Sequence, residues 1–332
     1  MTQFHVAPGQ DVRWGDGKQG FAAVHVFDEL EIRAIEAALG AQRPLLLLGE
    51  PGVGKSQLAR AAAEILGWNF CSLTVDAHTE ARDLKWSEDL VARLAKAQIL
   101  GALRSVDDDA KDNAAWLSAS LASVDMKNFV RPGPLWWAFD WESASKQAER
   151  ANAPIMKNVG DANPKNRTVV LIDEIDKAQS ELPNGLLEAL GQREFTPTGY
   201  GEPVRAQDDN WPLVILTSNE ERRMPDAFIR RCVVHRIRMP ETPDHIIAFL
   251  IDRGAKHFSD LDQDTLKIAA EMTVADRQTC KDNRLFPLPG QAEYLDLLRA
   301  FVSDDTPADS SASERLKSLQ PFFLHKHADF PR

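Results

Sequence analysis

Residues 49–56 read GEPGVGKS, which fits the pattern G-x4-G-K-[ST]. Residues 45–48 are four leucines and form a short apolar strand, and residues 57–66 show the apolar periodicity of a helix that ends at Gly67. A glycine-rich loop that leads into a helix N-terminus presents backbone N–H groups and the positive end of the helix dipole to an anion. The stretch therefore predicts a phosphate-binding loop, and its flanks disfavour the alternative of a glycine-rich turn that binds nothing.

The residues of this loop have distinct expected roles. Gly49 and Gly54 let the backbone approach a phosphate closely. Lys55 would reach the β- and γ-phosphates, and the Ser56 hydroxyl would ligate Mg²⁺. The predicted nucleotide-contacting set is the loop and the residue after it, namely Gly49, Glu50, Pro51, Gly52, Val53, Gly54, Lys55, Ser56 and Gln57.

The composition limits the class of protein. The chain has 332 residues, of which 43% are hydrophobic, enough for one large or two medium domains with a buried core. No run of about 18 apolar residues is present and the N-terminus lacks a signal-peptide core, so we expect neither a membrane span nor secretion. Cys71, Cys232 and Cys280 are far apart and are expected to be reduced thiols of a cytoplasmic protein. The net charge of −11 disfavours a general nucleic-acid binder.

Apolar strands alternate with helices up to Pro240, which is typical of a parallel sheet covered by helices on both faces. Beyond this point the pattern is helical, so we place a domain boundary at 240–243. The expected strands are 45–48, 70–75, 169–172, 213–216 and 233–237, and the expected helices are 28–39, 57–66, 84–103, 180–190, 245–253, 264–272 and 291–301.

The expected fold class is α/β, with a second, smaller helical part. We divide the chain into an irregular segment at 1–24, an α/β nucleotide-binding domain at 25–240, and a helical lid domain with a tail at 241–332. Insertions are expected near 104–167 and near 194–205, and the second of these is a predicted hairpin.

A second group of polar residues follows the apolar strands of the predicted sheet. Asp173 and Glu174 end a buried strand, where the first would hold Mg²⁺ and the second would polarise an attacking water. Asn219 ends the next strand, and an amide there can orient water against a γ-phosphate. The alternatives are carboxylates that only solvate a strand end and an ordinary turn asparagine, and the phosphate-binding loop disfavours the first of them.

Two consecutive arginines, Arg230 and Arg231, precede the strand at 233–237. One interpretation is a surface salt-bridge pair. The other is a cation that completes the phosphate site of a neighbouring subunit. In related phosphoryl-transfer chemistry such an arginine supplies about 10³–10⁵ in rate, or about 4–7 kcal/mol of barrier.

These landmarks, in this order, resemble those of the AAA+ ATPases and, within them, the MoxR branch. The resemblance covers about residues 25–305 and includes RPGPLWWA at 131–138 and TSNEERRMPDAFIRRC at 217–232. It implies a P-loop AAA+ core with a helical lid, ATP and Mg²⁺ as cofactors, and a hexameric ring. It also implies ATP hydrolysis that remodels a protein partner, in this branch often one with a von Willebrand factor A domain.

The resemblance also implies roles for individual residues. Glu174, Asn219 and Arg231 match the Walker B glutamate, sensor 1 and the trans arginine finger. Arg230 is adjacent and leaves the identity of the finger open. Ser56 and Asp173 match the magnesium-binding positions of the family.

The sequence departs from this family where a sensor-2 arginine is expected. The matching stretch, at the start of a helix in the lid, is Pro289-Gly290-Gln291-Ala292-Glu293 and has no arginine. Either the lid senses nucleotide differently, or Arg284 or Arg299 substitutes.

Three further features lie outside the predicted nucleotide site. Trp136, Trp137 and Trp141 are either core packing or part of a loop that grips a client. We expect Trp136 and Trp137 to split, one packed and one exposed, because neighbours in an extended segment face opposite sides. The hairpin around Tyr200 is either a pore element or a connector, and residues 79–84 are either a subunit contact or a capped helix start.

The predicted function is ATP hydrolysis by a homo-oligomeric ring. Two other classes stay open. One is a nucleotide-dependent switch or scaffold with slow turnover, which the missing arginine favours. The other is a nucleic-acid-stimulated NTPase motor, such as a GTP-using restriction subunit, which the acidic charge disfavours.

Overall fold

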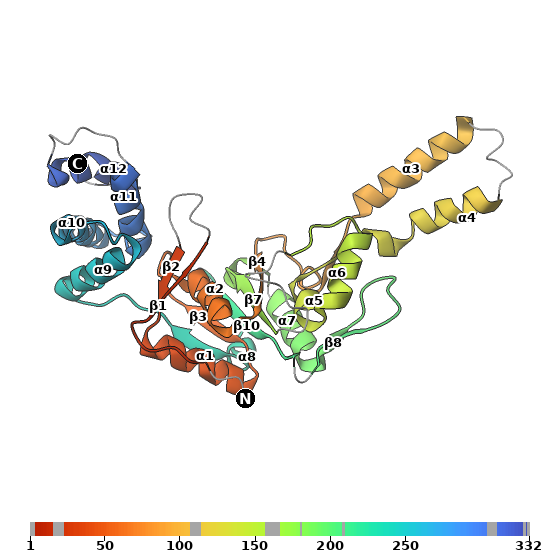
Figure 1. Cartoon of the computed structure of the whole chain (residues 1–332), viewed down its shortest axis with the longest axis horizontal. Coiled ribbons are helices and arrows are strands. Elements are labelled where there is room, and N and C mark those ends of the chain that lie inside the picture. The colour runs from red at the N-terminus through yellow and green to blue at the C-terminus, as the bar shows by residue number, and fades with distance from the viewer. Residues whose placement is uncertain are drawn as a thin grey trace. The chain divides into compact units, whose positions relative to one another are not determined.

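The computed structural model describes residues 4–15, 23–106, 114–156, 167–179, 181–207, 210–303, 311–327 and 330. The chain forms two compact units (Figure 1). The first contains Ala37–Leu46 and Ala62–Val233, and the second contains Gln3–Glu36, Leu47–Ala61 and Val234–Arg332. None of the helices within the described ranges is both long and apolar enough to cross a membrane.

The central sheet has five strands in the order β11-β3-β10-β7-β4. Strand β7 lies parallel to β10, with Ile172 opposite Leu216, and parallel to β4, with Ile172 opposite Leu73. The backbone N–H of Ile237, just after β11, donates to the carbonyl oxygen of Leu48. The strands are β3 (Leu45–Leu48), β4 (Asn69–Thr74), β7 (Thr168–Asp173), β10 (Leu213–Ser218) and β11 (Val233–Arg236).

The predicted α/β fold class is confirmed. Each of the five expected strands forms, and the interior strands β7 and β10 are apolar because both of their faces are covered by helices. Three of the covering helices are α1 (Glu29–Ala41), α2 (Lys55–Leu66) and α7 (Glu181–Gln192). Helix α1 buries Ile35 and Ala38, whereas its Leu30 side chain is 65% exposed.

In the first unit, the predicted helix at 84–103 begins later than expected. Strand β5 (Trp86–Glu88) pairs antiparallel with β6 (Val130–Pro132), and only then does α3 (Leu90–Val106) start. Residues 79–84 form hydrogen-bonded turns and not a helix start. Trp86 explains the change, because its ring stacks on Phe195 and fixes this segment in an extended form. Helix α4 (Ala114–Ser123) follows α3 (Figure 1).

The tryptophan segment contradicts the expectation from sequence. Residues Pro134–Phe139 form helix α5, and every residue in it is buried, including Trp136 and Trp137. The predicted split between these two side chains was wrong because it assumed an extended segment. A short helix packed against β4, β6 and β7 and covered by α6 (Trp141–Arg150) buries successive residues together.

The predicted hairpin near 194–205 forms from β8 (Glu194–Phe195) and β9 (Val204–Arg205). Its tip residue Tyr200 makes an edge-on contact with the ring of Trp136, at 5.0 Å between centroids. This contact favours a connector that packs on its own unit. Within the expected insertion at 104–167, residues 107–113 and 157–166 lie outside the described ranges.

In the second unit, residues 1–24 are not wholly irregular. Strand β1 (Asp11–Trp14) pairs antiparallel with β2 (Ala23–Val26), a hairpin that the sequence analysis missed. Four helices then form after β11, and the last of them was not predicted. They are α9 (Pro243–His257), α10 (Gln263–Asp282), α11 (Gln291–Ser303) and α12 (Ala312–Phe323), and they bury an apolar core of their own around Leu250, Leu266, Tyr294, Leu298 and Leu316.

Candidate active site

The P-loop connects β3 to α2, as the motif predicts. It needs glycine most clearly at Gly52, whose φ of +77° lies in the left-handed region. A Cβ atom at Gly52 would also lie 2.7 Å from the Cβ atom of Ala292. The backbone N–H of Leu58 donates to the carbonyl oxygen of Gly54, so the first turn of α2 begins directly at the loop.

Lys55 folds back over the loop that carries it. Its Nζ donates to the carbonyl oxygens of Gly49 and Glu50, each at 2.8 Å. The residue is only 7% exposed. These bonds hold the ammonium group against the backbone of the loop, so its positive charge and the loop's N–H groups can act together on a bound anion.

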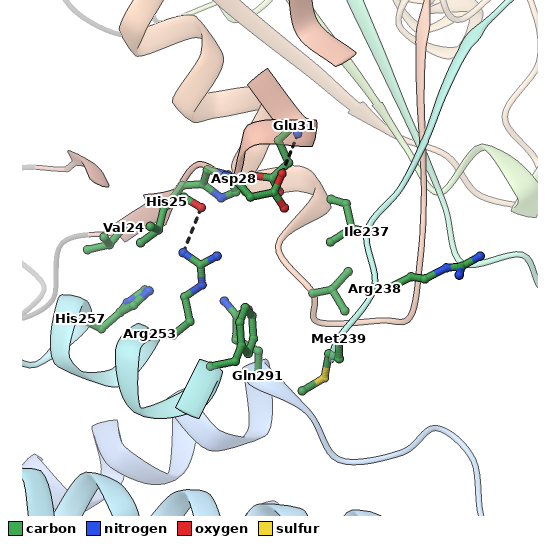
Figure 2. Close-up of a pocket in the computed structure, with 13 residues that line it drawn as sticks. Val24, His25, Asp28, Glu31, Ile237, Arg238, Met239, Arg253, His257 and Gln291 are labelled. Carbon is green, nitrogen blue, oxygen red and sulfur yellow. Dashed lines mark hydrogen bonds and ion pairs between the residues drawn. The ribbon is translucent and has the colours of Figure 1, made fainter. Parts of the chain in front are cut away.

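A pocket lies beside the P-loop within the second unit (Figure 2). Val53 of the loop lines it, together with residues of β2 and of the segment that leads into α1, residues after β11, and residues of α9 and α11. Arg253 Nη1 donates to the carbonyl oxygen of Val26 at 3.0 Å (Figure 2). The lining residues are Val24, His25, Val26, Asp28, Glu31, Val53, Ile237, Arg238, Met239, Phe249, Arg253, His257 and Gln291.

The charged groups of this pocket are held by one another. Burial opposes ionisation of Glu31, but the hydrogen bond and the charge of His25 outweigh it, so the pKa of Glu31 lies below its ordinary value. Burial, with the nearby Arg299 and Arg253, lowers the pKa of His257 to about 4, so this imidazole is neutral near pH 7. The pocket is thus partly apolar and also carries acidic and basic side chains, namely Asp28, Glu31, Arg238 and Arg253.

In the first unit, Asp173 and Glu174 end strand β7, and a hydroxyl group from the neighbouring strand joins them. Thr217 Oγ1 donates to Asp173 Oδ1 at 2.5 Å and accepts from the backbone N–H of Glu174 at 2.9 Å. Glu174 has a φ of +59°, an uncommon conformation for a residue other than glycine. Thr217 thus fixes both the first carboxylate and the turn that carries the second.

The loop after β10 is tied to the same region. The backbone N–H of Glu221 donates to Asp176 Oδ2 at 2.9 Å, and that of Glu220 donates to Ser218 Oγ at 2.9 Å. Asn219 lies between these anchors and is half-buried. Since β7 and β10 are parallel neighbours in register, the predicted residues Asp173, Glu174 and Asn219 emerge at the same edge of the sheet.

A sequence profile of the AAA ATPase domain matches residues 28–200, which is more than half of the chain. The chain belongs to the AAA ATPase family. Over 54 residues, 16% of its length, this AAA ATPase is 46% identical to midasin of Giardia intestinalis, and the match spans 1% of midasin.

Two solved structures are similar to this AAA ATPase. One is the RuvB Holliday junction branch migration motor of Thermotoga maritima, with 15% identity, a TM-score of 0.43, and coverage of 88% of this chain and 66% of that one. The other is a putative ATPase from Cytophaga hutchinsonii, with 12% identity, a TM-score of 0.39, and coverage of 89% of this chain and 79% of that one.

The two candidate finger arginines of this AAA ATPase lie just beyond α8 (Asp226–Ile229). Arg230 and Arg231 are both exposed, and no ion pair with either is found in the described part of the chain. Arg43 Nη1 donates to the backbone carbonyl oxygen of Arg230 at 3.5 Å, and this bond does not involve the Arg230 side chain. Within the first unit, neither arginine is brought to Asp173 or Glu174 by any described contact.

The sequence analysis missed Thr217 as a bridging residue and Arg277 as a partner of the P-loop. Arg277 on α10 pairs with Glu50, whereas Arg299 pairs with Asp296 in its own helix. Both missed residues act through bonds to positions far away in the chain. The strand-end run Thr217-Ser218-Asn219 was a signal for the first, and no local signal marks the second.

Proposed function

We propose that this AAA ATPase binds ATP with Mg²⁺ at the P-loop and hydrolyses it as a MoxR-like motor. The observation that carries the proposal is the pair of acidic residues at the end of β7, where Thr217 Oγ1 bonds to the carboxylate of Asp173 and to the backbone N–H of Glu174. Nucleotide binding needs only the P-loop, whereas hydrolysis also needs a group that activates water.

Each residue has a proposed role. The loop from Gly49 to Gln57 holds the phosphates, with Lys55 as its cation. Ser56 and Asp173 would hold Mg²⁺, since hydroxyl and carboxylate oxygens are the hard donors that this ion prefers, and the ion would neutralise charge on the phosphates. Glu174 accepts a proton from the attacking water, and Asn219 orients that water.

We further propose that the pocket beside Val53 takes the base of the nucleotide. Its lining of valine, isoleucine, methionine and phenylalanine side chains supports this role, because a flat aromatic base buries apolar surface on both faces. His257 is neutral and Glu31 is paired with His25, so neither of these groups opposes an uncharged base.

The proposed assembly is a hexameric ring in which Arg231 acts on the site of the neighbouring subunit, with Arg230 as the alternative finger. The exposure of both side chains supports action in trans. The ring would remodel a protein client or effector, such as one with a von Willebrand factor A domain, and the net charge of −11 disfavours nucleic acid as the partner. Free thiols at Cys71, Cys232 and Cys280 support a cytoplasmic location.

The domain division stays a proposal as well. We keep an α/β nucleotide-binding domain over residues 25–240 and a C-terminal lid from 241. The apolar core that α9–α12 bury among themselves supports a separate helical part.

One observation favours the second candidate, a nucleotide-dependent switch with slow turnover. Lys177 Nζ donates to Glu174 Oε2 at 2.6 Å, so the proposed base is paired with a cation. This bond occupies a carboxylate oxygen that proton transfer from water would use.

Steady-state ATPase assays on the wild type, Lys55→Ala and Glu174→Gln test the proposal. We expect turnover by the wild type, loss of binding in Lys55→Ala, and retained binding without turnover in Glu174→Gln. Equal, slow turnover in the wild type and Glu174→Gln would support the switch. Preference for GTP together with stimulation by DNA would support the nucleic-acid-stimulated motor.

A further inference from the structure

An ion pair between Glu50 and Arg277 joins the P-loop to α10. Arg277 Nη2 donates to the two carboxylate oxygens of Glu50, at 3.0 and 2.8 Å. Its Nη1 donates to the carbonyl oxygen of Pro289 at 2.9 Å. The Arg277 side chain is 13% exposed, whereas that of Glu50 is 51% exposed. The guanidinium group is therefore anchored on one side by a neutral backbone acceptor and offers its other side to the P-loop.

The loop meets the C-terminal helices at a second point. Gly52 lies so close to the first turn of α11 that an added Cβ atom would be 2.7 Å from the Cβ atom of Ala292. The start of this helix is fixed by Glu293 Oε2, which accepts from the backbone N–H of Gly290 at 2.9 Å. The loop around Glu50 and Gly52 therefore lies against both α10 and α11.

We propose that Arg277 is the cation through which the C-terminal helices sense a phosphate bound at the P-loop, with Glu50 as the anion that the phosphate replaces. The inference rests on the proposed nucleotide-binding function. A guanidinium group binds carboxylate and phosphate oxygens with the same planar geometry, so the exchange keeps its hydrogen bonds. Pro289 holds the guanidinium group in place, and the exposed Glu50 side chain moves into solvent.

The positions of the other arginines single out Arg277. Arg299 Nη1 is bound to Asp296 Oδ1 at 2.5 Å, within α11. Arg284 is exposed beyond the end of α10. Among the contacts that the structure describes, the arginine of the C-terminal helices that reaches the P-loop is Arg277. Arg277 would therefore take the role of the arginine that is missing at the start of α11, although it lies on α10.

Isothermal titration calorimetry with Mg²⁺ and ADP, and with Mg²⁺ and ATPγS, tests the inference on the full chain. We expect Arg277→Gln to weaken binding by about 10- to 100-fold, the worth of a hydrogen bond to a charged group. Glu50→Gln should bind more tightly, since it removes the competing anion. Lys267→Gln is the matched control, because Lys267 lies on the same helix in an exposed pair with Glu271, and it should bind like the wild type.

A second measurement separates sensing from folding. Hydrogen exchange should show that nucleotide protects α10 and α11 in the wild type and in Arg277→Lys, which keeps the charge, but not in Arg277→Gln. Unchanged affinity and protection in Arg277→Gln, with binding lost in Lys55→Ala, would overturn this inference and leave the proposed function intact. Nucleotide binding by Lys55→Ala would instead overturn the proposed function.

Discussion

The P-loop of the second unit and the Thr217-anchored residues Asp173 and Glu174 of the first unit are the two halves of the proposed nucleotide site, but they are built over different distances along the chain. Lys55 bonds to Gly49 and Glu50, which are 6 and 5 residues away. Thr217 bonds to Asp173 and Glu174, which are 44 and 43 residues away. The first half therefore depends on local backbone conformation, and the second depends on two strands being held side by side.

This difference predicts different kinds of failure. A change that strains the P-loop backbone should remove nucleotide binding and leave most of the fold in place. A change that disturbs the packing around β7 should instead lower the stability of the whole first unit, because the strand that carries Asp173 is also part of its core. Four substitutions test the comparison.

The largest expected effect is that of Trp137→Ala, in the helix that packs against β4 and β7. Trp137 is 2% exposed, so its loss should lower the free energy of unfolding by about 3–5 kcal/mol. Chemical denaturation measures this change. Leu94→Ala on α3, where the side chain is 61% exposed, is the control and should change stability by less than about 0.5 kcal/mol. Equal stability of the two variants would show that α5 does not support the second half of the site.

The next effect is that of Gly52→Ala in the local half. The new Cβ atom would meet Ala292, and the φ of +77° is strained for alanine, so we expect a cost of about 1–3 kcal/mol borne by the loop and the first turn of α11. Nucleotide affinity should fall by about tenfold or more, with little change in the melting temperature. Gly101→Ala is a suitable control, because a Cβ atom there meets nothing within 4 Å. A large drop in melting temperature would show that the loop is not a separate, local element.

Thr217→Val removes the bridging hydroxyl and keeps the shape of the side chain. Hydrogen bonds to a charged group contribute about 1.5–3 kcal/mol, so turnover should fall by about 10- to 100-fold. Nucleotide affinity should stay within about threefold of the wild type, since the P-loop does not use this residue. Thr217→Ser restores the hydroxyl and should restore turnover. If it does not, the loss of turnover in Thr217→Val comes from altered packing and not from the lost hydrogen bonds.

The smallest effect is that of Lys177→Ala, which frees Glu174 from its ion pair. The two side chains are 41% and 31% exposed, so solvent weakens the pair, and turnover should rise by no more than about fivefold. A rise in kcat would show that Lys177 restrains the base. No change, in a wild type that turns over quickly, would count against the switch.

The tryptophan segment shows where sequence reasoning reached its limit. Its apolar residues correctly predicted a surface that must be covered, but not what covers it. Trp136 and Trp137 are covered inside their own unit by the strands below α5 and by α6, whereas Leu90, Val91 and Leu94 on α3 are exposed. Apolar composition alone does not distinguish these cases, because burial depends on which elements pack against the segment.

The sequence by itself determined the P-loop, the five parallel strands and the positions of Asp173, Glu174 and Asn219, because these depend on motif spacing and on local apolar periodicity. Only the tertiary structure decided that Thr217 joins the Asp173 carboxylate to the backbone of Glu174, that Trp136 and Trp137 are both buried, and that Arg277 reaches Glu50 across 227 residues of chain. Each of these is a contact between segments far apart in sequence. Such contacts form only after strands and helices pack, so no local pattern of residues encodes them.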